Sequence, residues 1–190
     1  MATFFESTGD GGAAMDLDEF EVSILRTLEV QMLELIGPPP GGQGDDPLAA
    51  LFAEGPSEAP DDPVLHRLFP DAYGGPGAPE DPRTAEMAAE FRRYTELDLR
   101  TRKRDDALAV VRTLDGLAGG GVLEVGPDEL QRWLGALNDL RLALATRLEV
   151  TEEDTEGLYR LPDSDPRKPL VVAYLWLGGL QESLLDAMAG

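Results

Sequence analysis

The chain has 190 residues, with 37 Asp or Glu against 16 Lys or Arg, and its formal net charge at pH 7 is -21. Such a charge repels nucleic acid and anionic membranes and favours a basic protein partner or simple solubility, so we expect no direct nucleic-acid or membrane binding. The chain contains no cysteine and one histidine, His66, which excludes disulfides, thiol chemistry and multi-histidine metal sites within it.

The beginning of the chain predicts a short apolar arm. Residues 3–5 are apolar and form either an edge strand or an arm that packs on the protein, and residues 9–14 then read as a flexible turn. Residues 1–12 contain no basic residue and no apolar run of signal length. We therefore expect no secretory or transit peptide and a cytoplasmic protein.

A helical pattern begins at Asp16 and ends at Gly37 and the prolines that follow it. Acidic residues near its start suit the positive end of the helix dipole. Positions three and four apart place one set of mostly apolar residues on a common side, which we expect to be buried: Leu17, Phe20, Ile24, Leu28, Gln31 and Leu35.

Residues 37–62 predict a disordered insertion. They are rich in Gly, Pro, Asp and Glu, and most of them cannot bury enough apolar surface to offset their ordering entropy. Only residues 47–53 within the insertion have the pattern of a short helix with an apolar side. Residues 63–69 predict a stronger short helix, because Val64, Leu65, Leu68 and Phe69 recur at helical spacing after Pro63. We place His66 on its exposed side.

The next helix is predicted over residues 84–117. Met87, Phe91 and Tyr94 define an apolar face in its first half, and the same face continues into Asp98, Arg102 and Asp105, so that opposite charges alternate along it. The apolar positions move farther along the helix, which predicts a kink or a change of partner near residues 104–106. We interpret the basic run 100–104 as a solvated face that neutralises nearby carboxylates, rather than as a docking patch.

Residues 122–125 form a short apolar, extended segment, and the central helix of the fold follows them. One side of this helix carries an apolar stripe, which must be buried: Leu130, Trp133, Leu134, Leu137, Leu140, Leu144 and Leu148. Asn138 and Arg141 lie at the stripe, and a guanidinium there needs polar partners. We expect Arg141 to pair with Asp98 or Asp105 across two packed helices. The resulting structural polar cluster consists of Asp98, Arg102, Asp105, Asn138 and Arg141.

The last third of the chain predicts an acidic loop and a final helix. Four carboxylates cluster in the loop without basic neighbours and offer a partner-binding site, although a plain solvated loop is the simpler explanation: Glu152, Glu153, Asp154 and Glu156. The helix over residues 170–188 is apolar on nearly every side as far as Leu180, which predicts burial or a homo-oligomer interface between Leu170 and Leu185. It is too short for a membrane span, and Gly178 and Gly179 permit close packing.

Together these elements predict an all-α fold. We expect a single domain over residues 1–190, built as a compact bundle of about four main helices plus short helices, with the mobile Gly/Pro-rich insertion at 37–62. No phosphate-binding glycine motif occurs. We therefore assign no catalytic residues, no metal site and no cofactor.

Four ordered blocks resemble a known family: HRLFPDAY, EFRRYTELDLR, WLGALNDLRLALATRL and YLWLGGLQESLL. The chain is similar to a small actinobacterial domain-of-unknown-function family commonly encoded beside the Clp protease adaptor, which has an AosR-like oxidative-stress regulator branch. The resemblance implies a non-catalytic regulator that contacts an alternative sigma factor. It also implies redox sensing through a cysteine pair in that branch, and this chain has no cysteine.

Three functions fit these features. The first is a cytoplasmic regulatory or adaptor protein that acts by binding a protein partner, such as a sigma factor or another part of the transcription machinery. The second is a homo-oligomeric structural protein. The third is an enzyme that uses the cluster of Asp98, Arg102, Asp105, Asn138 and Arg141, although structural ion pairs explain such clusters just as well.

Overall fold

The computed structural model describes residues 4–38, 54–74, 81–151, 157–158 and 160–190. Within them the chain forms, in order, β1 (Glu6–Ser7), β2 (Ala13–Leu17), α1 (Glu19–Ile36), α3 (Pro63–Leu68), α4 (Pro82–Asp115), β3 (Gly121–Val125), α5 (Leu130–Arg147) and α7 (Lys168–Ala189). The structure is mostly helical, as expected, but it also contains a small sheet.

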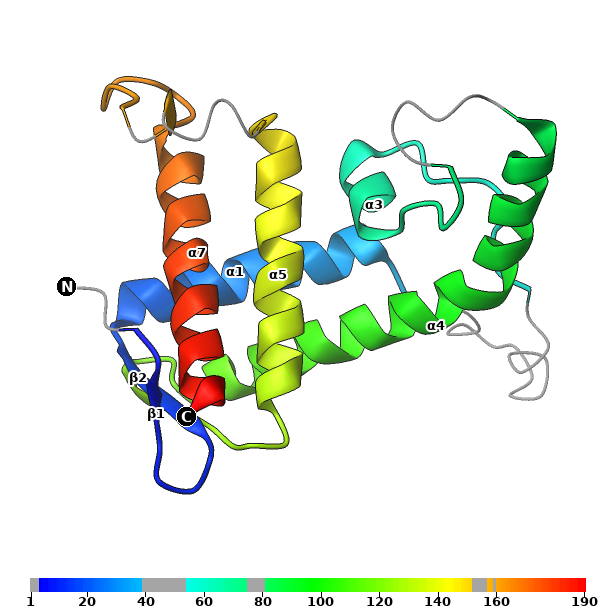
Figure 1. Ribbon diagram of the computed structural model, residues 1–190. Helices are drawn as coiled ribbons and strands as arrows, with labels where there is room; N and C mark the ends of the chain where they lie inside the picture. Colours follow the sequence, from blue (N-terminus) through cyan, green and yellow to red (C-terminus); the bar gives the residue numbers. More distant parts are fainter. Residues whose placement is uncertain (1–3, 39–53, 75–80, 152–156, 159) are drawn as a thin grey trace.

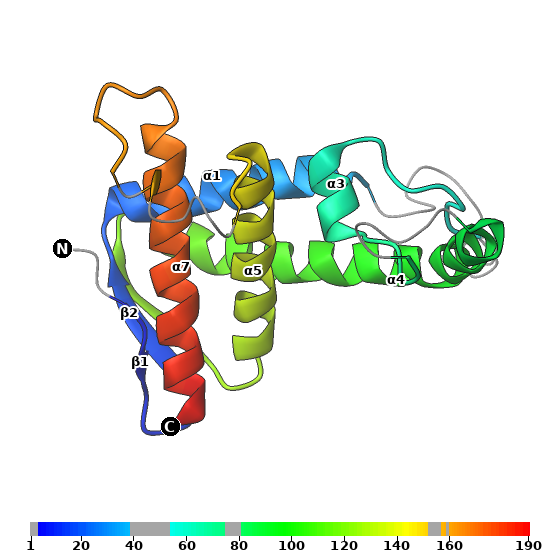
Figure 2. The ribbon, with the colours of Figure 1, turned by 45° about the horizontal axis from the view of Figure 1, so that its top comes forward.

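The helices form two crossed pairs (Figure 1). α1 and α4 lie alongside each other, and α5 and α7 cross them as a second pair. Figure 2 shows the same crossing from another direction, with the short α3 beside α5. α4 is bent, and its N-terminal part extends beyond the body formed by the other helices.

The sheet is antiparallel, with the strand order β1-β2-β3. Residues 13–17 form its middle strand, where we expected a turn and the start of a helix. Ala13, Met15 and Leu17 are buried and alternate with less buried residues, which is the period-two pattern of a strand. β2 pairs with β3 over the segment that the sequence indicated as extended, with Ala13 opposite Val125. The all-α prediction therefore missed this sheet.

α1 is a helix as predicted, but its buried side differs. Asp18 caps its first turn in a capping box with Glu21, and Gly37 ends it with a φ of 84°. Leu17 belongs to β2, so a face counted from Leu17 is offset from the true one. Phe20 is 71% exposed, and the buried positions are Val22, Leu25, Glu29, Met32 and Ile36.

The centre of the core lies on α5, as predicted. Trp133 and Leu137 have no exposed surface, and Leu130, Leu140 and Leu144 are also buried. The apolar N-terminal arm reaches this core, because the ring of Phe5 packs edge-on against Trp133 at 6.1 Å between centroids. The arm prediction is therefore confirmed at Phe5.

The predicted short helix over residues 63–69 is confirmed as α3, capped by Asp62, and His66 is exposed on it. Most of the predicted insertion, including the short helix at 47–53, lies outside the described residues. Next to that part, the Gly55 N–H donates to the carbonyl of Arg93 at 2.9 Å. Among the helices that the structure describes, none combines the length and apolar character of a membrane span.

Candidate functional site

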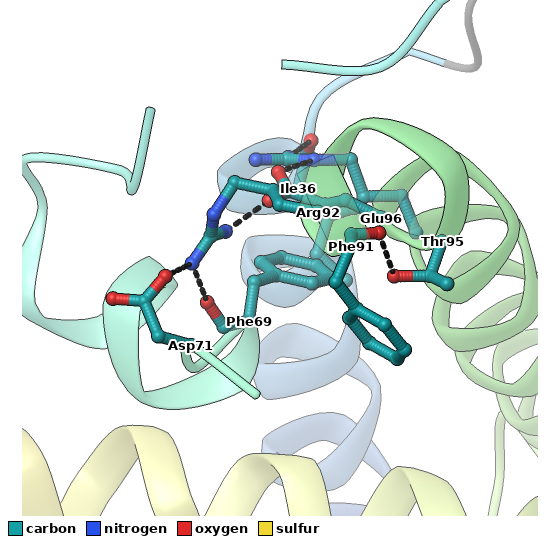
Figure 3. A network of polar contacts seen from close by, with 8 residues as sticks. Ile36, Phe69, Asp71, Phe91, Arg92, Thr95 and Glu96 are labelled. Carbon is teal, nitrogen blue, oxygen red and sulfur yellow. Dashed lines mark hydrogen bonds and ion pairs between the residues drawn. The ribbon is translucent and has the colours of Figure 1, made fainter. Parts of the chain in front are cut away.

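The first half of α4 turns charged side chains inward. Arg92 and Glu96 are 4% and 3% exposed, one helical turn apart, and Arg92 donates from Nη1 to the Glu96 carboxylate. Its Nη2 donates to the carbonyl of Phe69 at 3.0 Å and to Asp71 Oδ1 at 2.8 Å (Figure 3). A buried ion pair needs such additional hydrogen bonds to offset its desolvation. The pair therefore joins α4 to the chain that follows α3.

Two further arginines of α4 hold the end of α1. Arg100 donates to Glu96 at 2.9 Å and to the Ile36 carbonyl at 3.0 Å. Arg104 donates to the Leu33 carbonyl at 3.2 Å and also to that of Gly37. α1 has no basic residue in its own last turn, so these guanidiniums donate to the carbonyls at its end and balance its negative dipole end. Arg100 thus neutralises a nearby carboxylate, as expected of the basic run, but Arg100 and Arg104 are half-buried rather than solvated.

The inward position of Arg92 and Glu96 leaves the apolar face of α4 in solvent. Each helical residue is turned by about 100° from the one before it, so Met87, Phe91 and Tyr94 cannot face inward together with that pair. They are 43%, 45% and 67% exposed, respectively. The ring of Tyr73 joins them edge-on, 6.0 Å from that of Phe91. We call Tyr73, Met87, Phe91 and Tyr94 the aromatic patch.

A hollow of about 240 Å³ lies beside the aromatic patch. Its apolar lining includes Phe69, Ala88 and Leu99, and Arg92 and Glu96 contribute its polar part. Two exposed carboxylates, Glu90 and Asp98, lie one turn before and one turn after Tyr94. The arrangement is an exposed apolar centre with an acidic edge, a composition found in protein interfaces.

A second charged group lies where α1, α4 and α5 meet. Glu29 has no exposed surface, and neither of its carboxylate oxygens has a hydrogen-bond partner among the described residues. Asp139 of α5 accepts from Lys103 Nζ at 2.6 Å. Asp106 of α4 lies against Gly135, where an added Cβ would approach its Oδ2 to 2.9 Å. A larger residue at 135 would therefore displace the Asp106 carboxylate.

Burial controls the protonation of this second group. It raises the pKa of Glu29 from 4.5 to about 8, with a further contribution from the nearby charges of Asp139 and Asp106. Burial also raises the pKa of Asp139, against the opposing effect of Lys103. Glu29 is therefore protonated at neutral pH. Within the described part of the chain, no three acidic or histidine side chains converge to hold a metal ion.

The structure divides the predicted polar cluster between two places. Asp98, Arg102 and Asp105 line one hollow of about 280 Å³, together with Arg132 of α5. Asn138 lies elsewhere, where its Oδ1 accepts from Gln181 Nε2 of α7 at 3.4 Å.

Arg141 does not pair with Asp98 or Asp105. It donates to Gln181 Oε1, and its guanidinium carbon lies 5.5 Å from the ring centroid of Tyr174. The reason is geometric: α7 covers the side of α5 that carries Arg141, whereas α4 contacts a different side, where Asp139 meets Lys103. The buried charged residues Arg92, Glu96 and Glu29 were not predicted from the sequence. The only sign of their burial in the sequence was that these charged residues lie at helical spacing between apolar ones.

The predicted partner-binding residues Glu152, Glu153, Asp154 and Glu156 lie outside the described residues. Their role in binding a partner stays a prediction.

Comparison with known proteins connects the chain to a family over almost its whole length. The model of the family described as "Domain of unknown function (DUF2017)" matches residues 1–188. A protein of Mycobacterium bovis named oxidative stress regulator AosR is 31% identical over 177 residues, which are 90% of this chain and 79% of that protein. The protein of the same name from Mycobacterium tuberculosis matches with the same identity and coverage. No solved structure matches the chain.

Proposed function

Since the chain belongs to the DUF2017 family and is similar to mycobacterial proteins named oxidative stress regulator, we propose that it is a non-catalytic regulator of a stress response. We propose that it acts by binding a basic protein partner through the aromatic patch of α4. The observation that carries this proposal is made in the first half of α4, where the charged residues Arg92 and Glu96 are buried and the aromatic residues Phe91 and Tyr94 are exposed.

The energetics of α4 support a binding role. Burying a charged pair contributes little net stability compared with apolar packing, whereas an exposed aromatic ring forgoes the gain of its own burial. A helix that served the fold alone would place Phe91 and Tyr94 inward. Tyr, Phe and Met are also the residues enriched in the cores of protein interfaces. The first half of α4 is therefore better suited to a partner than to the protein's own core.

Charge supports a basic partner. The chain has a net charge of -21, and Glu90 and Asp98 flank the aromatic patch. Complementary charge at the edge of an interface raises the rate of encounter and rejects acidic partners. An alternative sigma factor, or another basic component of the transcription machinery, is the partner class to test first.

The signal must differ from thiol oxidation. This chain contains no cysteine, so a cysteine pair cannot report oxidation within it. We propose that it regulates by the presence or absence of its partner, or through a redox event on the partner itself.

Affinity capture tests the function. The tagged chain, a Phe91→Ser/Tyr94→Ser variant and a Phe20→Ser variant are each incubated with lysate of the source organism, and bound proteins are identified by mass spectrometry. Phe20 is an exposed aromatic residue on α1 and serves as the control. We expect the parent and the Phe20 variant to retain a common basic transcription protein that the double variant loses. Capture of that protein by all three chains, or of no transcription protein by the parent, contradicts the proposal.

A further inference from the structure

A second apolar surface lies on α7, away from the aromatic patch. A groove of about 640 Å³ follows this helix and is lined by Tyr174, Leu175, Gly178, Glu182 and Leu185, with Arg141 contributed by α5. Leu185 is 47% exposed, although it belongs to a helix that is otherwise rich in buried leucine. The groove is therefore an unpartnered face with both apolar and charged groups.

Four groove residues are spaced symmetrically along α7. Leu175, Gly178, Glu182 and Leu185 follow one another at intervals of three, four and three residues, which places them along one side of the helix. The intervals read the same in both directions. If a second α7 packs antiparallel across this face, each Leu175 meets Leu185 of the other copy, and each Gly178 meets Glu182 of the other copy. A stripe of this kind is self-complementary, as a two-fold interface requires.

The floor of the groove gives the helices room. Gly178 has no side chain, and a Cβ built there would lie 3.6 Å from Arg141 Nε. Its neighbour Gly179 is covered instead by the Phe4 ring of the N-terminal arm, 2.5 Å from where a Cβ would lie. Phe4 thus occupies the adjoining side of α7, whereas Gly178 faces the Arg141 guanidinium and lines the groove with it.

The charges are also complementary between copies. Arg141 donates to Gln181, its Nε is buried without a hydrogen-bond partner, and no carboxylate of the described residues forms an ion pair with it. Glu182 is exposed, and no ion pair within the described chain uses it. In the antiparallel arrangement Glu182 of one copy passes over Gly178 of the other, next to Arg141. A carboxylate in that position can form a charge-assisted hydrogen bond with the guanidinium.

We propose that α7 is a homodimer interface, in which two copies pack antiparallel about a two-fold axis and exchange Arg141–Glu182 ion pairs. The second copy is the occupant that fits best, because an acidic partner would meet Glu182 and Asp186, and a basic partner would meet Arg141. This inference does not depend on the proposed function, since it uses a different face of the molecule.

Charge exchange tests the interface. Sedimentation velocity over a concentration series should give the parent chain a mass near twice 20.5 kDa at high concentration. Glu182→Arg should give the monomer mass, as should Arg141→Glu. The double variant Arg141→Glu/Glu182→Arg restores an opposite pair and should recover the dimer. Glu124→Arg, an exposed charge reversal on β3, is the control and should remain dimeric.

Two cysteine variants test the antiparallel register. The chain has no native cysteine, so Leu175→Cys and Leu185→Cys each introduce a single thiol. Under mild oxidation, the mixture of the two variants should form disulfide-linked dimers, because residues 175 and 185 face each other. Either variant alone should not, since equivalent residues lie about 15 Å apart along the helices, beyond the reach of a disulfide.

The outcomes are distinct. A parent chain that stays monomeric at its highest soluble concentration overturns the proposal, and so does a Glu182→Arg variant that dimerises like the parent. Disulfide dimers of each single variant alone would indicate parallel packing and would also overturn the antiparallel arrangement. Circular dichroism of every variant separates loss of the dimer from loss of the fold.

Discussion

The carboxyl group of Glu29 is buried where α1, α4 and α5 meet. Asp106 and Asp139 lie nearby, and Lys103 pairs with Asp139. Because no described group hydrogen-bonds to its carboxylate, the neutral form is favoured, and burial raises its pKa to about 8. The folded chain therefore binds a proton that the unfolded chain, with an ordinary Glu, releases at lower pH. The consequence is that the free energy of unfolding decreases as pH rises.

Replacing Glu29 tests this. A group whose pKa is raised in the folded state stabilises it fully below the unfolded pKa, and this contribution is lost as pH rises through the folded value. Urea unfolding of the parent should thus show a stability that falls between pH 4.5 and about 8, by roughly 1 kcal/mol per pH unit from this group. Glu29→Gln, which cannot titrate, should lose that component. Glu34→Gln, exposed on the same helix, is the control. Equal pH profiles for the parent and Glu29→Gln would contradict the buried neutral carboxyl.

Arg92 carries the second prediction at this scale. Removing one partner of a buried ion pair leaves an uncompensated charge and costs about 3–5 kcal/mol. Arg92→Ala should therefore lower the free energy of unfolding by that order, measured by urea denaturation at pH 7. Arg93→Ala is a neighbouring control with a side chain 42% exposed, and it should change stability by no more than about 0.5 kcal/mol. Equal midpoints for the two variants would mean that Arg92 does not hold α4 to the rest of the chain.

At the scale of whole elements, α5 could be predicted from the sequence and the orientation of α4 could not. The stripe from Leu130 to Leu144 is long and leucine-rich, so helical periodicity identifies its buried side. The orientation of α4 depends on the carbonyl of Phe69 and on Asp71, which lie 23 and 21 residues before Arg92. Periodicity contains no information about such distant partners. It therefore identified Met87, Phe91 and Tyr94 as one apolar face, but it did not indicate that this face lies in solvent.

The sheet was not predicted, and the pairing within the polar cluster was predicted wrongly, for related reasons. β2 is short and begins with two alanines, and the neighbouring Leu17 also fits the helical pattern of α1, so the longer pattern concealed the strand. Arg141 and Asp98 have compatible chemistry, but which helix covers each side of α5 is decided by the packing of the whole bundle. The residues that form each helix could be predicted, whereas the pairing between helices could not.

The end of α1 gives a prediction at the element scale. Arg104 donates to the carbonyl of Leu33, which also accepts from the Gly37 N–H, and to the carbonyl of Gly37 just beyond the helix. Arg104→Ala should therefore speed amide hydrogen exchange in the last turn of α1 and leave its first turn, around Val22, unchanged. Arg102, which lies on α4 like Arg104, is exposed, and Arg102→Ala is therefore the control. It should change amide exchange at neither end of α1. Unchanged exchange at the last turn in Arg104→Ala would show that the guanidinium does not cap α1.

For the molecule as a whole, a net charge of -21 predicts how it meets a basic partner. Long-range attraction raises the encounter rate and is screened over a Debye length of about 8 Å at physiological ionic strength. The association rate measured by stopped flow should therefore fall steeply as salt is raised, while the dissociation rate changes less. Replacing Glu152, Glu153, Asp154 and Glu156 by Gln and Asn should reduce the salt dependence without changing thermal stability. An association rate that is independent of salt would exclude a basic partner.

The most direct test of the central claim is the affinity of the captured partner for chains altered in the aromatic patch. Isothermal titration should be performed on the parent, on Phe91→Ser/Tyr94→Ser and on Phe20→Ser, with circular dichroism to verify folding. Loss of two central aromatic contacts should weaken binding by at least about 30-fold, corresponding to about 2 kcal/mol. Phe20→Ser should bind like the parent. If the double variant binds as tightly as the parent, the first half of α4 is not where this regulator meets its partner.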